Sequence, residues 1–107
     1  MVLPTDSHIR VMDLGSMTVV GLEGHLEPPS ARLLEAEVLH ALERDSTTIV
    51  LDCSLLRSLG RSEVAVLARA SDQVHRRHGR FVVREANPAT LALLTSDPAF
   101  ADLEVED

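Results

Sequence analysis

Residues 51–67 read LDCSLLRSLGRSEVAVL and decide the fold, because here an apolar strand passes into an amphipathic helix. Residues 49–51 form an apolar run that begins with β-branched side chains, a pattern typical of a strand buried on both faces of a sheet. Beyond residue 60, one stripe recurs at three- and four-residue steps and predicts a helix: Val64, Leu67, Ser71 and Val74. Between the two elements we expect a polar loop that carries residues 60–63 (GRSE).

A hairpin and a helix are predicted ahead of this strand. Apolar and polar residues alternate loosely over residues 9–27, and Gly15-Ser16 supplies a turn midway, so this segment is interpreted as a β-hairpin. Residues 28–30 (PPS) then end the sheet and open a helix. Its apolar stripe predicts that the helix covers a sheet, and comprises Ala31, Leu34, Val38, Ala41 and Leu42.

The C-terminal third repeats the alternation of helix and strand. The helix after residue 61 is predicted to end at Gly79, the residue type that most readily takes a left-handed conformation. Residues 80–86 (RFVVREA) repeat the buried-strand pattern, and Asn87-Pro88 predicts the N-cap and first turn of a short third helix. The acidic tail, residues 101–107, fits either a last edge strand or a frayed end.

This order of elements predicts the fold class. Strands alternate with helices strongly enough to indicate an α/β fold in which amphipathic helices cover a mixed β-sheet. The 107 residues suffice for one hydrophobic core and are too few for two, so we expect a single domain over residues 1–107.

Charge and composition exclude several classes of partner. The 17 acidic residues outnumber the 10 basic ones and give a formal net charge of −7, which repels phosphate backbones and anionic membranes. Trp and Tyr are absent, so the stacking platforms of single-strand binders are missing. No apolar run approaches the ~20 residues that cross a bilayer. We therefore expect no nucleic-acid partner and no direct membrane insertion.

Nothing in the sequence indicates catalysis or a cofactor. Cys53 lies on a buried strand, where a thiol usually behaves as a small hydrophobe, and a lone cysteine cannot form an internal disulfide. His75 and His78 lack a nearby carboxylate or second cysteine, so a cation-favouring helix end explains them better than a metal. No Gly-x-Ser-x-Gly motif occurs. The N-terminus, residues 1–10, lacks a secretory signal pattern, and we expect a cytoplasmic protein.

Three segments, in order and at matching spacing, resemble one known family. Residues 24–27 (GHLE) are similar to its Gly-Glu-Leu-Asp turn, residues 51–54 (LDCS) to its Leu-Asp-Leu-Ser strand, and residues 78–83 (HGRFVV) to its basic-Gly-Gly-Arg-Leu-Val. On these segments the chain resembles the STAS domain family over essentially its full length. The resemblance implies a stand-alone anti-sigma factor antagonist, which binds an anti-sigma factor of histidine-kinase-like ATPase fold, itself a serine kinase, and frees a sigma factor.

The residues joining the central strand and helix depart from the family's pattern. The family has Asp-Ser-Ser-Gly here, and its first Ser accepts phosphate from the partner kinase. Spacing from Asp52 puts Gly60 on the Asp, Arg61 on that Ser, Ser62 on the second Ser and Glu63 on the Gly. A slip of one residue would instead make Ser62 the phosphoacceptor, and the sequence leaves both registers open.

Each of these residues has a structural and a functional interpretation. Ser62 can be the helix N-cap, or a phosphoacceptor whose phosphate would meet the free N–H groups at the helix start, and both roles can coexist. Arg61 can be a solvated residue or a fixed cation aimed at an acidic pocket on the partner, replacing the switch. Glu63, in the first helical turn, is explained by the helix dipole.

The leading functional hypothesis is a binding module without catalysis. Glu27, Gly60, Arg61, Ser62 and Glu63 would contribute to a patch of roughly 800 Å² that contacts the anti-sigma factor. The alternative is a non-phosphorylated STAS regulatory or scaffold subunit of a transporter, such as a membrane lipid-transport ATPase, or of a signalling complex.

Overall fold

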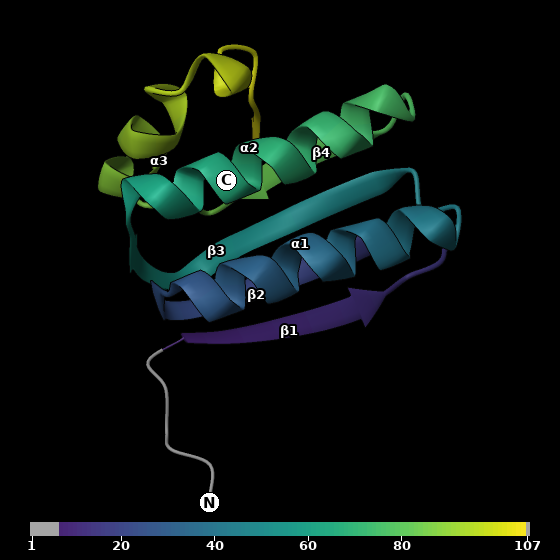
Figure 1. Ribbon diagram of the computed structural model, residues 1–107, viewed down its shortest axis with the longest axis horizontal. Helices are drawn as coiled ribbons and strands as arrows, with labels where there is room; N and C mark the ends of the chain where they lie inside the picture. Colours follow the sequence, from purple (N-terminus) through teal and green to yellow (C-terminus); the bar gives the residue numbers. More distant parts are fainter. Residues whose placement is uncertain (1–6, 107) are drawn as a thin grey trace, which may run out of the picture.

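A computed structural model of the protein describes residues 7–106, and residues 1–6 and 107 are not described. Five strands form one sheet in the order β1-β2-β3-β4-β5 (Figure 1). The strands are β1 (Ser7–Asp13), β2 (Met17–Leu26), β3 (Thr48–Leu59), β4 (Arg80–Arg84) and β5 (Glu104–Glu106). The helices are α1 (Pro28–Glu43), α2 (Arg61–Arg76), α3 (Pro88–Thr95) and the 3-10 helix η1 (Pro98–Phe100).

The sheet is mixed, as the sequence predicts. β1 and β2 pair antiparallel through the expected hairpin, whose turn contains Gly15 in the left-handed region with φ of 84°. β2, β3, β4 and β5 pair in parallel, and a helical segment connects each of these strands to the next. Parallel neighbours need such crossover connections, because a tight turn can join only antiparallel strands.

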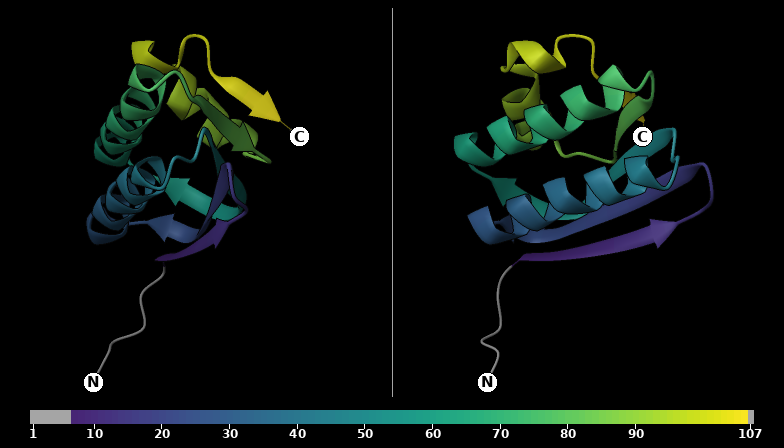
Figure 2. Two further views of the ribbon diagram at one scale, coloured as in Figure 1. Left: turned by 90° about the vertical axis from the view of Figure 1, so that its right-hand side faces the viewer. Right: turned by 45° about the vertical axis from the view of Figure 1, so that its right-hand side comes forward.

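The long helices α1 and α2 lie side by side on one face of the sheet (Figure 2). All five apolar positions of the stripe predicted for the first helix are buried. The opposite face carries three ion pairs between neighbouring strands: Arg10 with Glu23, Asp52 with Arg84, and Arg80 with Glu104. The helix-covered face holds the core, whereas the opposite face carries these ion pairs together with the buried side chains of Val50 and Val82.

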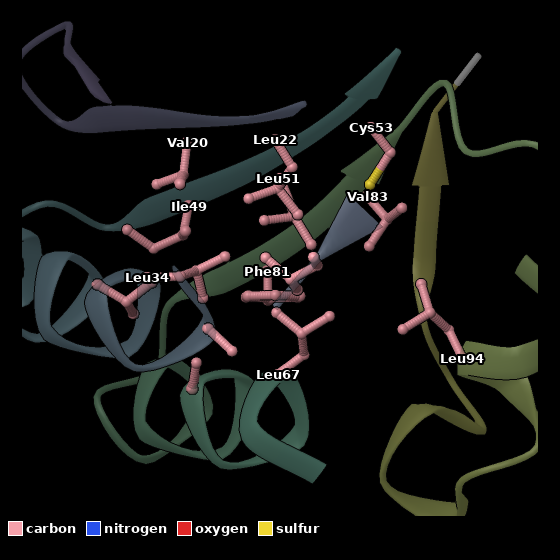
Figure 3. Packing of buried hydrophobic residues seen from close by; sticks show 14 of the residues in the cluster. Val20, Leu22, Leu34, Ile49, Leu51, Cys53, Leu67, Phe81, Val83 and Leu94 are labelled. Atoms are coloured by element: carbon pink, nitrogen blue, oxygen red, sulfur yellow. The ribbon is translucent and has the colours of Figure 1, made fainter. Parts of the chain in front are cut away.

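The core lies between the sheet and the two long helices (Figure 3). Ile49 and Leu51 of β3, Phe81 of β4, Leu34 of α1 and Leu67 of α2 are each at most 2% exposed. Burying a side chain of this size contributes about 1.5–3 kcal/mol to folding, which explains why the apolar stripes dictate where the helices lie. Cys53 also belongs to this cluster, as its position on a buried strand predicts.

The central strand is longer than the apolar run indicates. β3 continues to Leu59, and its pairing with β2 extends to Leu26 opposite Leu59 despite two irregularities in register. The polar loop predicted for residues 60–63 is therefore wrong, because Gly60 alone joins β3 to the helix that begins at Arg61. The second half of the strand has no continuous apolar run in the sequence, because Arg57 and Ser58 are polar and exposed.

The predicted role of Gly79 is also wrong. The residue in the left-handed region is His78, with φ of 61°, whereas Gly79 does not have a positive φ. Gly79 is needed for space, since a Cβ atom there would lie 2.8 Å from the Thr47 carbonyl oxygen and 3.0 Å from Cγ1 of Val74. The backbone passes too close to its neighbours for any side chain.

The short third helix predicted for the C-terminal third is confirmed, and of the two alternatives left open for the tail the structure has the edge strand. The Asn87 side chain accepts a hydrogen bond of 2.8 Å from the Thr90 N–H and caps α3, which Pro88 opens. The tail forms a short edge strand, with Val105 paired to Val83 of β4. Asp107, the last residue of the predicted tail, and residues 1–6 of the predicted leaderless N-terminus lie outside the described residues.

Candidate functional site

The predicted site residues 60–63 form the N-terminus of α2. Gly60 is the N-cap in an extended conformation (φ −92°, ψ 172°), and Arg61, Ser62 and Glu63 are the first three helical residues. The prediction that Ser62 is the N-cap is therefore wrong. The N-cap side chains that commonly satisfy the first helical N–H groups are missing here, since glycine has none.

Glu63 folds back over the start of the helix. Its Oε1 atom accepts a hydrogen bond of 3.2 Å from the Gly60 N–H, and its Oε2 atom accepts one of 2.8 Å from the Ser62 hydroxyl. Glu63 is only 6% exposed, which is rare for a carboxylate unless it is hydrogen-bonded. This geometry is one half of a capping box, in which the third helical residue binds the N-cap N–H.

Gly60 makes room for this carboxylate. A Cβ atom on residue 60 would lie 2.7 Å from Oε1 of Glu63, closer than such atoms approach one another. A side chain at residue 60 would therefore displace the Glu63 carboxylate from its present position. In the register counted from Asp52, Gly60 and Glu63 are the two departures from the family's pattern, and they contact each other.

Ser62 and Arg61 are the exposed residues at this helix start. The Ser62 hydroxyl is the donor to Glu63, so its proton points at a carboxylate. A carboxylate that accepts this bond can also take up the proton when the hydroxyl acts as a nucleophile. It also repels an incoming phosphate, because both groups are anionic. The static geometry is therefore compatible with a phosphoacceptor, although a phosphate on Ser62 would lie against Glu63.

The structure places Glu27 at the start of the neighbouring helix. Glu27 is the N-cap residue of α1, half-buried, and its carbonyl oxygen accepts a hydrogen bond of 2.9 Å from the Ala31 N–H. Because Leu26 is paired with Leu59, the chain leaves β2 and β3 at the same end of the sheet. Glu27 and Gly60 directly follow these two residues, so the topology brings all five predicted site residues to one end of the molecule (Figure 1).

Leu93 and Arg57 also lie at this end of the molecule, and neither was predicted from the sequence as a site residue. Leu93 of α3 lies between two hollows, one of about 110 Å³ lined also by Arg57 and one of about 210 Å³ lined also by Arg61. Helix α3 lies next to the start of α2 (Figure 1). No local sequence signal joins residue 57 to residue 93, because only the folding of α3 against β3 and α2 brings them together.

Other reactive side chains do not form a site within residues 7–106. Burial raises the pKa of the Cys53 thiol to about 12, with a smaller contribution from the negative charge of Asp52, so the thiol stays protonated. In this range no three metal-ligating side chains come together, and His75 and His78 lie at the exposed C-terminal end of α2. Within the same residues no helix is long and apolar enough to span a membrane.

Comparison with known families identifies the fold. The family model described as "Mlab, STAS domain" matches residues 9–96. The protein belongs to the STAS domain family, and the α/β fold with a mixed sheet and covering helices is the one that the sequence predicts. A search of curated proteins finds no significant match.

Solved structures with this fold include regulatory proteins. The anti-sigma factor antagonist SpoIIAA in its unphosphorylated form is 17% identical with a TM-score of 0.78, over 94% of this chain and 88% of that one. An anti-sigma factor antagonist from Mycobacterium paratuberculosis is 21% identical with a TM-score of 0.78, over 99% of this chain and 90% of that one. A chain of the stressosome, a signal integration and transduction hub, is 19% identical with a TM-score of 0.70, over 91% and 86%.

Proposed function

We propose that this protein is an anti-sigma factor antagonist that acts by binding alone. Its partner is an anti-sigma factor of histidine-kinase-like ATPase fold in the cytoplasm, and its binding frees a sigma factor. The observation that carries the proposal is the α2 N-terminus, which presents Arg61 and Ser62 to solvent on a STAS fold. The similarity in fold to two anti-sigma factor antagonists supports it.

We propose further that phosphorylation of Ser62 does not control this binding. Glu63 already places a carboxylate at the helix start beside Ser62, where it binds the Gly60 N–H and the Ser62 hydroxyl. A phosphate on Ser62 would carry about −1.5 to −2 charges beside this carboxylate and would be repelled. In the register that puts Arg61 at the position of the family's acceptor, a serine kinase finds no hydroxyl there to phosphorylate.

Affinity capture from the native cytosol and membranes tests the binding partner. The tagged protein is expected to retain a small ATP-binding anti-sigma factor that mass spectrometry identifies and that binds the purified protein in a titration. If transporter or scaffold subunits are retained instead and no such kinase binds, the antagonist proposal is wrong.

Phosphate transfer tests the switch separately. After incubation with the captured kinase and ATP, the intact mass of the protein is expected to remain unchanged. The Ser62→Ala variant is the control. Added phosphate on the wild type that is absent from this variant would show that Ser62 is an acceptor and that the second part of the proposal is wrong.

A second candidate is a STAS subunit of a transporter or a signalling scaffold. The family model that matches the chain carries the Mlab description, and a stressosome chain shares the fold. Such subunits need a docking surface but no phosphorylation switch. The Glu63 carboxylate beside Ser62 disfavours a phosphate there and so fits this role. Co-purification of membrane transporter subunits, in amounts that survive washing with high salt, would favour this candidate over the first.

A further inference from the structure

One surface of the protein is distinguished by arginines that form no ion pair with an acidic side chain of residues 7–106. Six of the ten arginines form ion pairs, and Arg77 donates a hydrogen bond of 3.2 Å to the Leu42 carbonyl oxygen. The remaining three, Arg32, Arg57 and Arg61, are exposed and have no ion-pair partner between residues 7 and 106. On a chain with a net charge of −7, unpaired cations are the exception.

Two of these three arginines line the hollows beside α3. Arg57 lines the hollow of about 110 Å³ together with Ala89 and Leu93. Arg61 lines the hollow of about 210 Å³ together with Leu93, Val64 and Pro98. We call this region the Leu93 surface, made of Arg57, Arg61, Val64, Ala89, Leu93 and Pro98. It consists of a half-buried leucine with an unpaired cation on either side.

We propose that the Leu93 surface binds an acidic amphipathic segment of the partner protein, with an apolar side chain over Leu93 and carboxylates facing Arg57 and Arg61. Charge complementarity identifies this occupant, because a cation without a partner in the free protein gains one on binding. The guanidinium group also binds a carboxylate in a two-pronged geometry, which fixes orientation.

The acidic groups near this surface do not oppose the proposal. Asp97 lines the same hollow as Arg61, but its Oδ1 atom accepts a hydrogen bond of 2.9 Å from the Ala99 N–H and caps η1. Glu63 is buried and faces Gly60 and Ser62. The Glu63 carboxylate faces Gly60 and Ser62 and forms no ion pair with Arg61, so it does not neutralise the positive charge of Arg61.

This inference rests on the proposed function for the identity of the partner, but its test does not need that partner. The probe is a synthetic helical peptide that presents glutamates on either side of a leucine stripe, and the matched probe has glutamine in place of each glutamate. Binding is followed by backbone amide chemical shifts of the full-length protein at low and high salt.

We expect the glutamate peptide to shift the amides of Arg57, Arg61 and Leu93, and high salt to weaken the binding. The double variant Arg57→Glu/Arg61→Glu should weaken it on the order of tenfold, as two exposed charge pairs are lost and repulsion is added. The control is Arg32→Glu, which changes the charge of an equally unpaired arginine on α1, outside both hollows.

Three results would overturn the inference: equal binding of the glutamine peptide, shifts confined to other surfaces, or the same loss in Arg32→Glu as in the double variant. An anti-sigma factor that binds the double variant as tightly as wild type would also overturn it while the proposed function stands. Conversely, localised peptide binding without any kinase-like partner would retain the surface and reject the antagonist.

Discussion

The carboxylate of Glu63 accepts a hydrogen bond of 3.2 Å from the backbone N–H of Gly60, and its Oε1 atom lies in the space that a Cβ atom of residue 60 would need. The pair explains how a helix can start at a residue that offers no capping oxygen. It also places Gly60 and Glu63 in direct contact, so that a change at either residue acts on the other.

The first prediction concerns this pair. Gly60→Ala should destabilise the protein by about 1–2 kcal/mol, because the new Cβ displaces Glu63 and the helix loses a cap. Glu63→Ala should cost a similar amount, and the double variant should cost clearly less than the sum, since both changes remove the same hydrogen bond. Urea denaturation measures all three.

The matched control for the glycine change is Gly21→Ala on β2. A Cβ there would meet only the Arg10 carbonyl oxygen at 3.8 Å and Arg10 Cβ at 3.9 Å, which are ordinary contacts. Its stability should stay near that of the wild type. Strict additivity of the Gly60 and Glu63 changes would contradict the coupling between the two residues.

The second prediction concerns the end of α2. Gly79→Ala should destabilise by about 1–3 kcal/mol, because the new Cβ would overlap the Thr47 carbonyl oxygen and Val74. His78→Gly should instead stabilise by up to about 1 kcal/mol, because it relieves the left-handed φ of 61°. Thermal unfolding of the two variants checks that Gly79→Ala is less stable and His78→Gly more stable than the wild type. An equal loss of stability in both variants would show that the strain has been assigned to the wrong residue.

The third prediction concerns pH. Burial alone would raise the pKa of Asp52, but hydrogen bonds from Ser54 and the ion pair with Arg84 outweigh it and lower this pKa below the ordinary value. A lowered pKa in the folded state means that the ionised form stabilises the fold. This contribution is present above the pKa of the unfolded chain and is lost as the pH falls through the folded-state pKa.

Asp52→Asn should therefore reduce stability at neutral pH and flatten its decline as the pH falls from the pKa of an unfolded aspartate through the lower folded-state pKa. Asp102→Asn removes an exposed carboxylate that forms no ion pair with residues 7–106 and serves as the control. Denaturation midpoints across this pH range measure the effect. A profile for Asp52→Asn that parallels the wild type would contradict the assigned role of the ion pair.

The fourth prediction concerns Cys53. With its pKa raised to about 12 and its side chain 2% exposed, the thiol should not react with a disulfide reagent in the native protein at pH 8. In denaturant it should react at the rate of an ordinary thiol. Rapid modification of the native protein would mean that β3 opens locally and that this part of the core is less stable than its burial indicates.

The apolar stripes were sufficient to predict the two long helices, because each stripe indicates which face must be buried. The turn at Gly15-Ser16 predicted the hairpin, and Asn87-Pro88 predicted the short third helix. The apolar pattern could not show where β3 ends. Arg57 and Ser58 are exposed, so the strand continues without an apolar signal and is held by its pairing with β2 up to Leu59. That error displaced the predicted helix cap from Gly60 to Ser62.

The sequence predicted that residues 60–63 lie where the central strand passes into the helix, but it did not predict the contacts that they make there. The motif spacing led to residues 60–63, but the inward orientation of Glu63 depends on where the helix starts. Leu93 carries no motif and lies more than thirty residues from Arg57 in sequence, so its contribution follows only from the packing of α3.

The most direct test of the central claim is a calorimetric titration of the purified anti-sigma factor with this protein, its Arg61→Glu variant and its Arg32→Glu variant, with release of the sigma factor measured in parallel. The account predicts that the wild type and Arg32→Glu bind and release sigma factor, that Arg61→Glu binds more weakly, and that prior incubation with ATP changes none of these results. Absence of binding by the wild type, or equal binding by Arg61→Glu, would contradict it.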